Sequence, residues 1–330
     1  MKGEGREDKA GPEPLRAPWW ARGGHVQTLA AHLLKSPPAL IPWERLTLGL
    51  ADGDALRIRL ARGSSHRVVY LFHGLGGDAD RDYMARAATA FHRAGDSVVA
   101  VNHRGAGEGR GAALRPYHSG AVGDLAAVFE MGRGHFPDHR HLAIGYSLSG
   151  NILLLLLGQD GEGGLAKPDA AIAVNPPADL EACSLRLARG LCRLYDLRFV
   201  RLLRAELKAR AEAGQLPFPV RLPRGSTLRD FDEAYTARAA GFRDRADYYE
   251  RCSCGPHLAG IRVPTVVLSA EDDPIAPASE LRAFPMSSAV RLHAEPRGGH
   301  CGYLDRDAPG RRWLEGALAH FADELLPGRA

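Results

Sequence analysis

Ser147 has the sequence context of a catalytic nucleophile. It lies in Gly145-Tyr146-Ser147-Leu148-Ser149-Gly150, directly after an expected strand at 141–144. A sharp turn from a strand into a helix exposes a serine hydroxyl for attack on a carbonyl carbon, and small flanking residues permit that turn. The usual pattern is G-x-S-x-G, whereas here Ser149 takes the last position and glycine follows one residue later. Because ordinary turns also hold serines, the assignment depends on partners elsewhere in the chain.

Two aspartates follow the expected strand 265–269, in the segment Asp272-Asp273-Pro274. In a catalytic triad an acid fixes the tautomer of the histidine and stabilises its protonated form. We assign this role to Asp273 and keep Asp272 as the alternative. A solvated loop carboxylate is the simpler interpretation of either residue taken alone.

His300 lies in the glycine-rich segment Gly299-His300-Cys301-Gly302, before an expected final helix at 309–325. Histidine suits a base that later acts as an acid near neutral pH. The chain has 14 histidines, so an isolated surface histidine would be the ordinary interpretation. The order Ser147, Asp273, His300 is nevertheless the order nucleophile, acid, histidine expected of a hydrolase built on a parallel sheet. This order, with each residue after an expected strand, favours a triad.

A glycine-rich loop could complete the site. The segment His73-Gly74-Leu75-Gly76-Gly77 follows an expected buried strand at 68–72. Backbone N–H groups in such a loop can stabilise the negative charge of a tetrahedral intermediate. We therefore expect the N–H groups of Leu75 and Leu148 to form an oxyanion hole, although glycines of this kind also occur in plain turns.

The elements that must position these residues alternate between strands and helices. The helical spacing of apolar residues at 82–94 ends at Gly95, between expected strands at 68–72 and 97–102. Further helices are expected at 123–130 and 150–157, further strands at 141–144, 170–174 and 265–269, and an antiparallel hairpin at 45–60. This alternation predicts an α/β fold with a mostly parallel central sheet and helices on both faces.

About ninety residues separate the strands at 170–174 and 265–269. A single crossover needs far fewer, so residues from about 178 to 258 are predicted to form a helical insertion. Between Arg186 and Arg210 this insertion interleaves seven arginines and Lys208 with leucines. We interpret that pattern as a solvated helix face opposite a packed one. Weak contact with anionic lipid head groups is the alternative.

The composition and the remaining motifs argue against several other classes of function. The net charge of +4 is too small to argue for nucleic acid, and five cysteines show no metal-ligand spacing. The segment 102–111 loosely resembles a dinucleotide loop, but it does not open directly into a helix. We expect no metal or cofactor, reduced thiols, a disordered tail at 1–16 and one domain at 17–330. The N-terminus lacks the layout of a secretory signal, which indicates a cytoplasmic protein of unknown oligomeric state.

The chain resembles the YheT-type branch of the α/β-hydrolases, also called AB-hydrolase family 4, over nearly its whole length. This branch groups bacterial esterases with eukaryotic medium-chain ester and phospholipid hydrolases. The resemblance rests on Gly24–Thr28, His73–Leu75, Asn102–Gly105, Tyr117–Gly120 with Asp124, Gly145–Leu148, Asp230–Phe242, Asp247–Tyr249, Asp272–Pro274 and Gly299–Gly302.

The resemblance implies an α/β-hydrolase fold, a lid-like insertion at 178–258, and Ser147, Asp273 and His300 as nucleophile, acid and base. The family commonly has glycine where this chain has Ser149. Its other motifs receive structural interpretations here. We expect His25 and Gln27 to tie the N-terminal arm to the core, and we expect two ion pairs, Arg104 with Asp124 and Asp232 with Arg238. Substrate contact is the alternative for some of these residues.

The expected activity is that of a serine carboxylic ester hydrolase on small or medium-chain acyl esters. Leucine-rich helices of the insertion would line an apolar acyl pocket. Two alternatives remain open. An acyltransferase would pass the acyl group to an alcohol instead of water, and a lipid-binding scaffold would leave the triad idle.

Overall fold

A computed structural model describes residues 11–35, 40–159 and 164–327. Residues 1–10 of the predicted disordered tail lie outside these ranges. From Glu13 the chain contacts the rest of the fold, because the Glu13 carbonyl oxygen accepts a hydrogen bond from Trp313 Nε1. The Arg16 N–H likewise donates to Asp305 Oδ2 at 2.5 Å.

The strands form one eight-stranded sheet in the order β1-β2-β4-β3-β5-β6-β7-β8. The first hairpin pairs antiparallel, β2 is antiparallel to β4, and all later pairs are parallel. The mostly parallel sheet predicted from the sequence is therefore confirmed. The strands are β1 Glu44–Gly49, β2 Ala55–Ala61, β3 Arg67–Phe72, β4 Ser97–Asn102, β5 Arg140–Tyr146, β6 Ala170–Val174, β7 Thr265–Ala270 and β8 Val290–Glu295.

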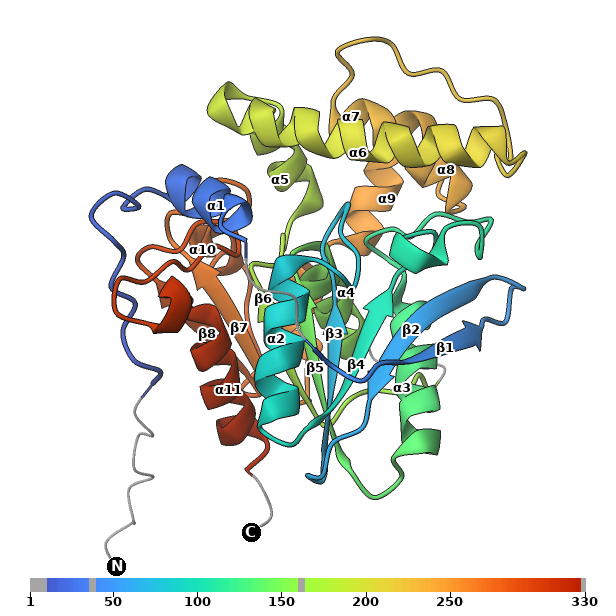
Figure 1. Cartoon of the computed structure of the whole chain (residues 1–330). Coiled ribbons are helices and arrows are strands. Elements are labelled where there is room, and N and C mark those ends of the chain that lie inside the picture. The colour runs from blue at the N-terminus through green and yellow to red at the C-terminus, as the bar shows by residue number, and fades with distance from the viewer. Residues whose placement is uncertain (1–10, 36–39, 160–163, 328–330) are drawn as a thin grey trace, which may run out of the picture.

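Helices cover both faces of this sheet (Figure 1). On β3, Val69 and Leu71 pack with α2 and α11, whereas Tyr70 and Phe72 pack with α3 and α4. Successive side chains of a strand point to opposite faces, which explains this division. The helices are α1 Gly24–Leu33, α2 Asp82–Arg93, α3 Val122–His135, α4 Leu148–Gly158, α5 Leu180–Leu187, α6 Arg193–Glu212, α7 Leu228–Phe231, α8 Ala237–Ala239, α9 Arg245–Cys252, α10 Ala278–Leu281 and α11 Leu314–Leu325.

Helices α5 to α9 all lie between β6 and β7 in the chain, and Figure 1 shows them gathered above the ends of the strands. Asn151 on α4 attaches this group to the sheet domain. Its side-chain amide donates to the carbonyl oxygens of Ser119 and Cys252 at 3.0 and 2.8 Å, and its Oδ1 accepts the Cys254 N–H at 2.9 Å. The described part of the chain contains no helix long and apolar enough to cross a membrane.

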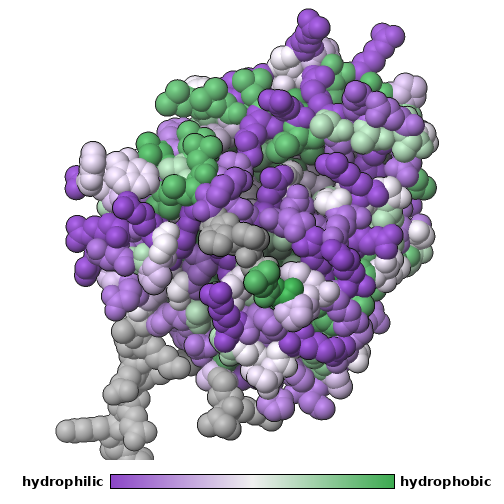
Figure 2. All heavy atoms as spheres, in the orientation of Figure 1, coloured by the Kyte–Doolittle hydropathy of each residue, from purple (hydrophilic) through white to green (hydrophobic). Residues whose placement is uncertain are grey.

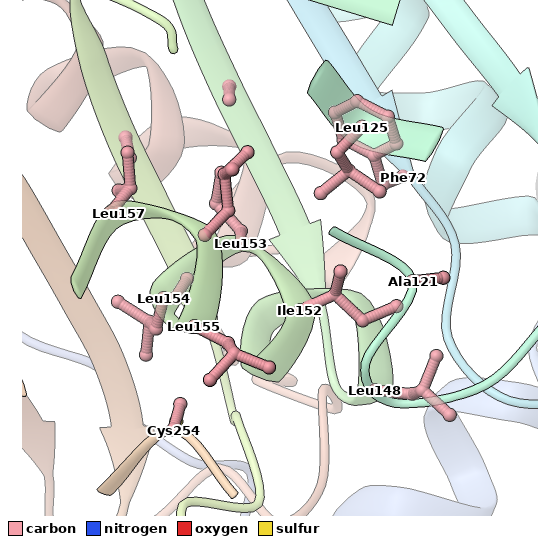
Figure 3. Packing of buried hydrophobic residues seen from close by; sticks show 14 of the residues in the cluster. Phe72, Ala121, Leu125, Leu148, Ile152, Leu153, Leu154, Leu155, Leu157 and Cys254 are labelled. Carbon is pink, nitrogen blue, oxygen red and sulfur yellow. The ribbon is translucent and has the colours of Figure 1, made fainter. Parts of the chain in front are cut away.

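Helix α4 is the central element of the core, because every one of its residues is buried. Leu154 and Leu155 point toward Cys254, whereas Leu153 and Leu157 point to the opposite side of the helix (Figure 3). A helix that is apolar all round must be enclosed by other elements. Helix α4 packs against β5, β6, α3 and the turn Gly255–Gly260.

Leu153→Ala should lower the free energy of unfolding by about 2–5 kcal/mol, because it leaves a cavity beside the sheet. Leu114→Ala is the control, since Leu114 is 60% exposed. Urea unfolding followed by circular dichroism measures both variants. Equal effects at the two positions would contradict the central role of α4 in the core.

Candidate active site

Ser147 is the single residue between β5 and α4, and its backbone is strained. Its φ and ψ are 51° and −117°, a combination that L residues rarely adopt. The Ser147 N–H donates to the carbonyl oxygen of Val174 at 2.8 Å, and its own carbonyl accepts the Asn151 N–H at 3.1 Å. Both neighbouring elements thus hold the turn in place.

The turn brings Gly145 against the first residues of α4. A Cβ atom on Gly145 would lie 2.5 Å from the Ser149 carbonyl oxygen, so only glycine fits there. The side chain of Ser149 is fully buried, and its hydroxyl donates to the His73 carbonyl oxygen and contacts His103 Nε2 at 2.7 Å. The Ser149 side chain therefore fits at this position, and its hydroxyl has hydrogen-bond partners.

His300 lies between Ser147 and Asp273. Its Nε2 is 2.8 Å from Ser147 Oγ, and its Nδ1 is 2.8 Å from Asp273 Oδ2. A carboxylate accepts, so Nδ1 carries the proton and Nε2 is free to accept the Ser147 hydroxyl proton. The other aspartate has a different partner, because Asp272 Oδ1 accepts the Gly299 N–H at 2.8 Å.

The Asp273 carboxylate is fully surrounded by donors. Burial alone would raise its pKa, but His300 and the N–H groups of Ile275 and Ala276 outweigh burial and hold the pKa below its usual value. Those two N–H groups donate to Oδ1 at 2.8 and 3.1 Å. The aspartate is therefore ionised over the whole neutral range, as an acid that orients a histidine must be.

Asn175, directly after β6, was missed by the sequence reasoning. Its side-chain amide donates to Asp273 Oδ2 at 2.7 Å and to the Gly299 carbonyl oxygen at 3.2 Å, while its Oδ1 accepts the Cys301 N–H at 3.2 Å. It is completely buried with φ 48°. The sequence signal that could have identified it is an asparagine directly after a buried strand, because parallel strands bring the residues that follow them to one edge of the sheet.

Helix α1 supports the His300 loop. Thr28 Oγ1 accepts the His300 N–H at 2.9 Å, and the side chain of Gln27 both donates to the Leu304 carbonyl oxygen and accepts the Leu304 N–H. The expectation that Gln27 ties the N-terminal arm to the core is confirmed. His25 differs in that it reaches the insertion, where its Nδ1 lies 3.0 Å from the hydroxyl of Tyr195 on α6.

The loop after β3 leaves one N–H group available beside Ser147. Gly74, Gly76 and Gly77 donate their N–H groups to the Tyr83 hydroxyl, the Tyr117 hydroxyl and the Gly74 carbonyl oxygen. The Leu75 N–H has no acceptor among the described residues. A Cβ on Gly74 would lie 3.2 Å from Ser147 Cβ, so this loop directly adjoins the serine.

Leu148 presents the second expected donor. It is the first residue of α4. Because the first N–H groups of a helix have no acceptor within the helix, this group is free to meet a ligand. Both expected donors therefore flank the Ser147 side chain from different elements.

Two buried histidines brace the loop. Burial lowers the pKa of His73 to about 4 and holds that of His103 well below its usual value, so both rings are neutral. His73 Nδ1 donates to the Gly74 carbonyl oxygen at 2.8 Å, and its Nε2 accepts the His103 N–H at 3.2 Å. A neutral His73 ring with its proton on Nδ1 can make both of these hydrogen bonds.

Two cavities meet at Ser147. The smaller, of about 90 Å³, is lined largely by the insertion. The larger, of about 390 Å³, is lined by His300, α1 and the loop after β3. Leucines of the insertion were predicted to line a pocket. They line the smaller cavity, and they are Leu180, Leu187, Leu203, Leu207 and Leu228.

The two expected ion pairs have opposite outcomes. Arg104 and Asp124 form a bidentate pair with both distances at 2.7 Å, and Arg104 also reaches Asp54 at 2.6 Å, so this prediction is confirmed. The predicted pair of Asp232 and Arg238 is wrong. Arg238 stacks over the ring of Phe218 at 4.2 Å, and Asp232 accepts a hydrogen bond from the Tyr249 hydroxyl at 2.7 Å.

Asp232 is instead a buried acid in the wall of the smaller cavity. Burial raises its pKa to about 6, because the hydrogen bonds from Tyr249 and Thr236 and the charges of Arg245 and Arg229 only partly offset desolvation.

No group of histidine, cysteine and acidic side chains suited to a metal ion occurs in the described ranges, and all five cysteines are free thiols.

Asp232→Asn should raise the free energy of unfolding at pH 7.5. The folded chain holds the carboxyl proton more tightly than the unfolded chain, so stability is lost as the pH rises through 4 to 6. The loss reaches about 3 kcal/mol above that window. The gain from the substitution should shrink by more than half at pH 4.5 in urea unfolding. The control is Asp138→Asn at an exposed turn. A gain that is independent of pH would contradict the burial of an ionised Asp232.

Known proteins resemble this chain in sequence and in fold. The family model of the alpha/beta hydrolase fold matches residues 67–307. YheT of Escherichia coli (strain K12) is 30% identical over 93% of this chain and 92% of its own, and the monoacylglycerol lipase of Saccharomyces cerevisiae is 26% identical over 77% and 58%. The esterase Pf2001 of Pyrococcus furiosus shares the fold, with a TM-score of 0.58 and 14% identity over 96% of this chain and 99% of that one. The chain is thus an enzyme of the α/β-hydrolase family and belongs to the branch that contains YheT.

Proposed function

We propose that this protein hydrolyses carboxylic esters through a covalent acyl-enzyme on Ser147. The observation that carries the proposal is the chain of two 2.8 Å contacts from Ser147 Oγ through His300 to Asp273. A neutral histidine held by a buried carboxylate can take the serine proton as the hydroxyl attacks a carbonyl carbon. The strained turn presents that hydroxyl to the substrate.

The remaining steps use groups already in position. The N–H groups of Leu75 and Leu148 would hold the oxyanion of the tetrahedral intermediate. His300 then gives its proton to the departing alcohol oxygen, which leaves the acyl group on Ser147. Water attacks this ester with His300 as base, and a second tetrahedral intermediate releases the acid and restores the Ser147 hydroxyl. No step requires a metal or an organic cofactor.

The two cavities suggest where the halves of the ester bind. His300 must protonate the alcohol oxygen, and it lines only the larger cavity, so we assign the alcohol to that side. The acyl group then occupies the smaller cavity of about 90 Å³. An apolar cavity of about 150 Å³ can bind benzene, which favours an acyl group of fewer than about six heavy atoms here.

The larger cavity is lined by Leu29 of α1, which is 47% exposed and supports an apolar alcohol, and further leucines of α1 and α6 are exposed. Leu33 on α1 and Leu34 after it are 73% and 41% exposed, and Leu191 before α6 and Leu194 on it are 67% and 61% exposed. Figure 2 shows hydrophobic residues gathered over α1 and the nearby end of α6. With the arginines of α6, they also support weak contact with a membrane surface. The similar yeast protein is named a monoacylglycerol lipase, which fits an ester with a lipid-like part.

Ser147→Ala and His300→Ala should each lower kcat for p-nitrophenyl butyrate by about 10⁴-fold or more, because each removes a member of one proton-transfer unit. The double variant should be no worse than either single one, since the triad acts as a unit. Release of p-nitrophenol measures turnover, and circular dichroism checks the fold. Retention of most activity in a folded Ser147→Ala protein would refute the acyl-enzyme.

The adjacent aspartates offer a matched pair for the acid. Asp273→Asn should reduce kcat by about 10⁴-fold, because an amide at this position favours the wrong histidine tautomer. Asp272→Asn should cost less than tenfold, since its Oδ1 only accepts the Gly299 N–H. The same assay measures both. If Asp272→Asn were the damaging change, the acid would be wrongly assigned.

A further inference from the structure

Part of the wall of the smaller cavity, called the acyl-side cavity from here on, is polar. Four of its side chains carry hydrogen-bonding groups within the insertion, namely Glu206, Arg210, Asp232 and Tyr235. An alkyl chain would leave all of these groups without a partner in the substrate. Their presence in a small cavity that also contains Ser147 needs a chemical reason.

Two buried polar atoms in this wall have no hydrogen-bond partner in the described part of the protein. They are the hydroxyl of Tyr235 and Nε of Arg210. The ring of Tyr235 is held edge-on against Phe231, with ring centroids 5.7 Å apart, and the residue is only 3% exposed. A buried donor left unpaired is costly, so such atoms commonly mark the site of a ligand group.

The local backbone directs these residues to the cavity. Asp232 to Thr236 form a turn of π-helix between α7 and α8, and Asp232, Tyr235 and Thr236 all line the cavity. Turns of this kind are rare and occur often at functional sites. The hydroxyl of Tyr249 holds Asp232 Oδ2 at 2.7 Å, which fixes the carboxyl group at the cavity wall.

The charges in this wall favour a neutral partner. Arg210 already donates to the carbonyl oxygens of Ala113 and Leu114 and lies 3.5 Å from Glu206 Oε1, so it offers little unbalanced charge to a carboxylate. A hydroxyl group is both donor and acceptor and is cheaper to desolvate than an ion.

We propose that the acyl-side cavity selects short acyl groups that carry a hydroxyl, recognised by the Tyr235 hydroxyl and the Asp232 carboxyl group. This inference rests on the proposed ester hydrolysis and specifies its acid half. The reaction at Ser147 is unchanged, with the acyl C–O bond broken and water supplying the new oxygen. Ser147 and Tyr235 line the same cavity of about 90 Å³, so the hydroxyl would lie on an acyl chain short enough to fit there.

The test compares ethyl butyrate with each enantiomer of ethyl 3-hydroxybutyrate, which share the alcohol and the chain length. Each kcat/KM is divided by the alkaline hydrolysis rate of the same ester to remove its intrinsic reactivity. The better hydroxy ester should be preferred by about tenfold or more, since a site built for a hydroxyl discriminates against its absence. Tyr235→Phe should lower that preference by about tenfold.

Tyr146→Phe is the matched control. The Tyr146 hydroxyl is also buried with no partner among the described residues, but Tyr146 lines the larger, alcohol-side cavity and not the acyl-side one. The preference should survive this change. Asp232→Asn is a second variant should Tyr235→Phe prove unstable, and it should also lower the preference.

The outcomes separate the two proposals. Turnover of ethyl butyrate without preference for either hydroxy ester, or a preference that both Tyr235→Phe and Asp232→Asn leave intact, would overturn the hydroxyl site and leave ester hydrolysis standing. Hydrolysis of none of these esters, nor of p-nitrophenyl butyrate, would overturn both. A preference lost with Tyr235 and kept in Tyr146→Phe is the expected result.

Discussion

The site depends on the backbone of Ser147, which is held at a positive φ between a strand and a helix. Such a conformation costs about 1–3 kcal/mol for a residue with a side chain, and it persists only where the surroundings fix it. Here β5 lies within the parallel part of the sheet and α4 is buried along its whole length. Gly145 is the second requirement, since a Cβ there would strike the carbonyl of Ser149.

A parallel sheet explains how distant parts of the chain meet at this turn. The carboxyl ends of β3, β5, β6 and β7 lie at one edge, and they are followed by Leu75, Ser147, Asn175 and Asp273. His300 is not on a strand, so it needs separate support. That support comes from the other end of the chain, because Thr28 of α1 accepts the His300 N–H and Asn175 holds the adjoining loop.

The insertion contributes side chains to both cavities beside Ser147. Its leucines form an apolar wall next to Ser147, while the π-helical turn Asp232–Thr236 adds polar groups to the same small cavity. The larger cavity is built from α1, the loop after β3 and one face of α6. The exposed Leu29 lines the larger cavity, whereas the smaller one has polar groups in its wall.

Periodicity and strand order predicted most of this architecture. The strand at 170–174 has the predicted bounds, and the helix at 82–94 differs by one residue, because both carry strong local patterns. Strand β8 and helix α1 were not predicted. Strand β8 lies at the edge of the sheet with only its first and last residues buried, and α1 exposes several apolar residues, so neither has a clear pattern.

Contacts between distant residues were harder to predict than elements. Asp273 was preferred to Asp272 on position alone, and the structure places Asp273 beside His300. The pairing of Asp232 with Arg238 failed because opposite charges six residues apart carry no information about which way each side chain points across a π-helical turn. Asn175 and Thr28 act through hydrogen bonds that only the folded chain brings together.

Labelling with an alkyl fluorophosphonate tests the central claim most directly, because the reagent reacts with a serine only when a triad activates it. Intact mass and peptide mapping should find one adduct, on Ser147, in the folded wild-type protein, and none in His300→Ala under the same conditions. A folded wild-type protein that takes up no label, or takes it up on another residue, would contradict activation of Ser147 by His300 and Asp273.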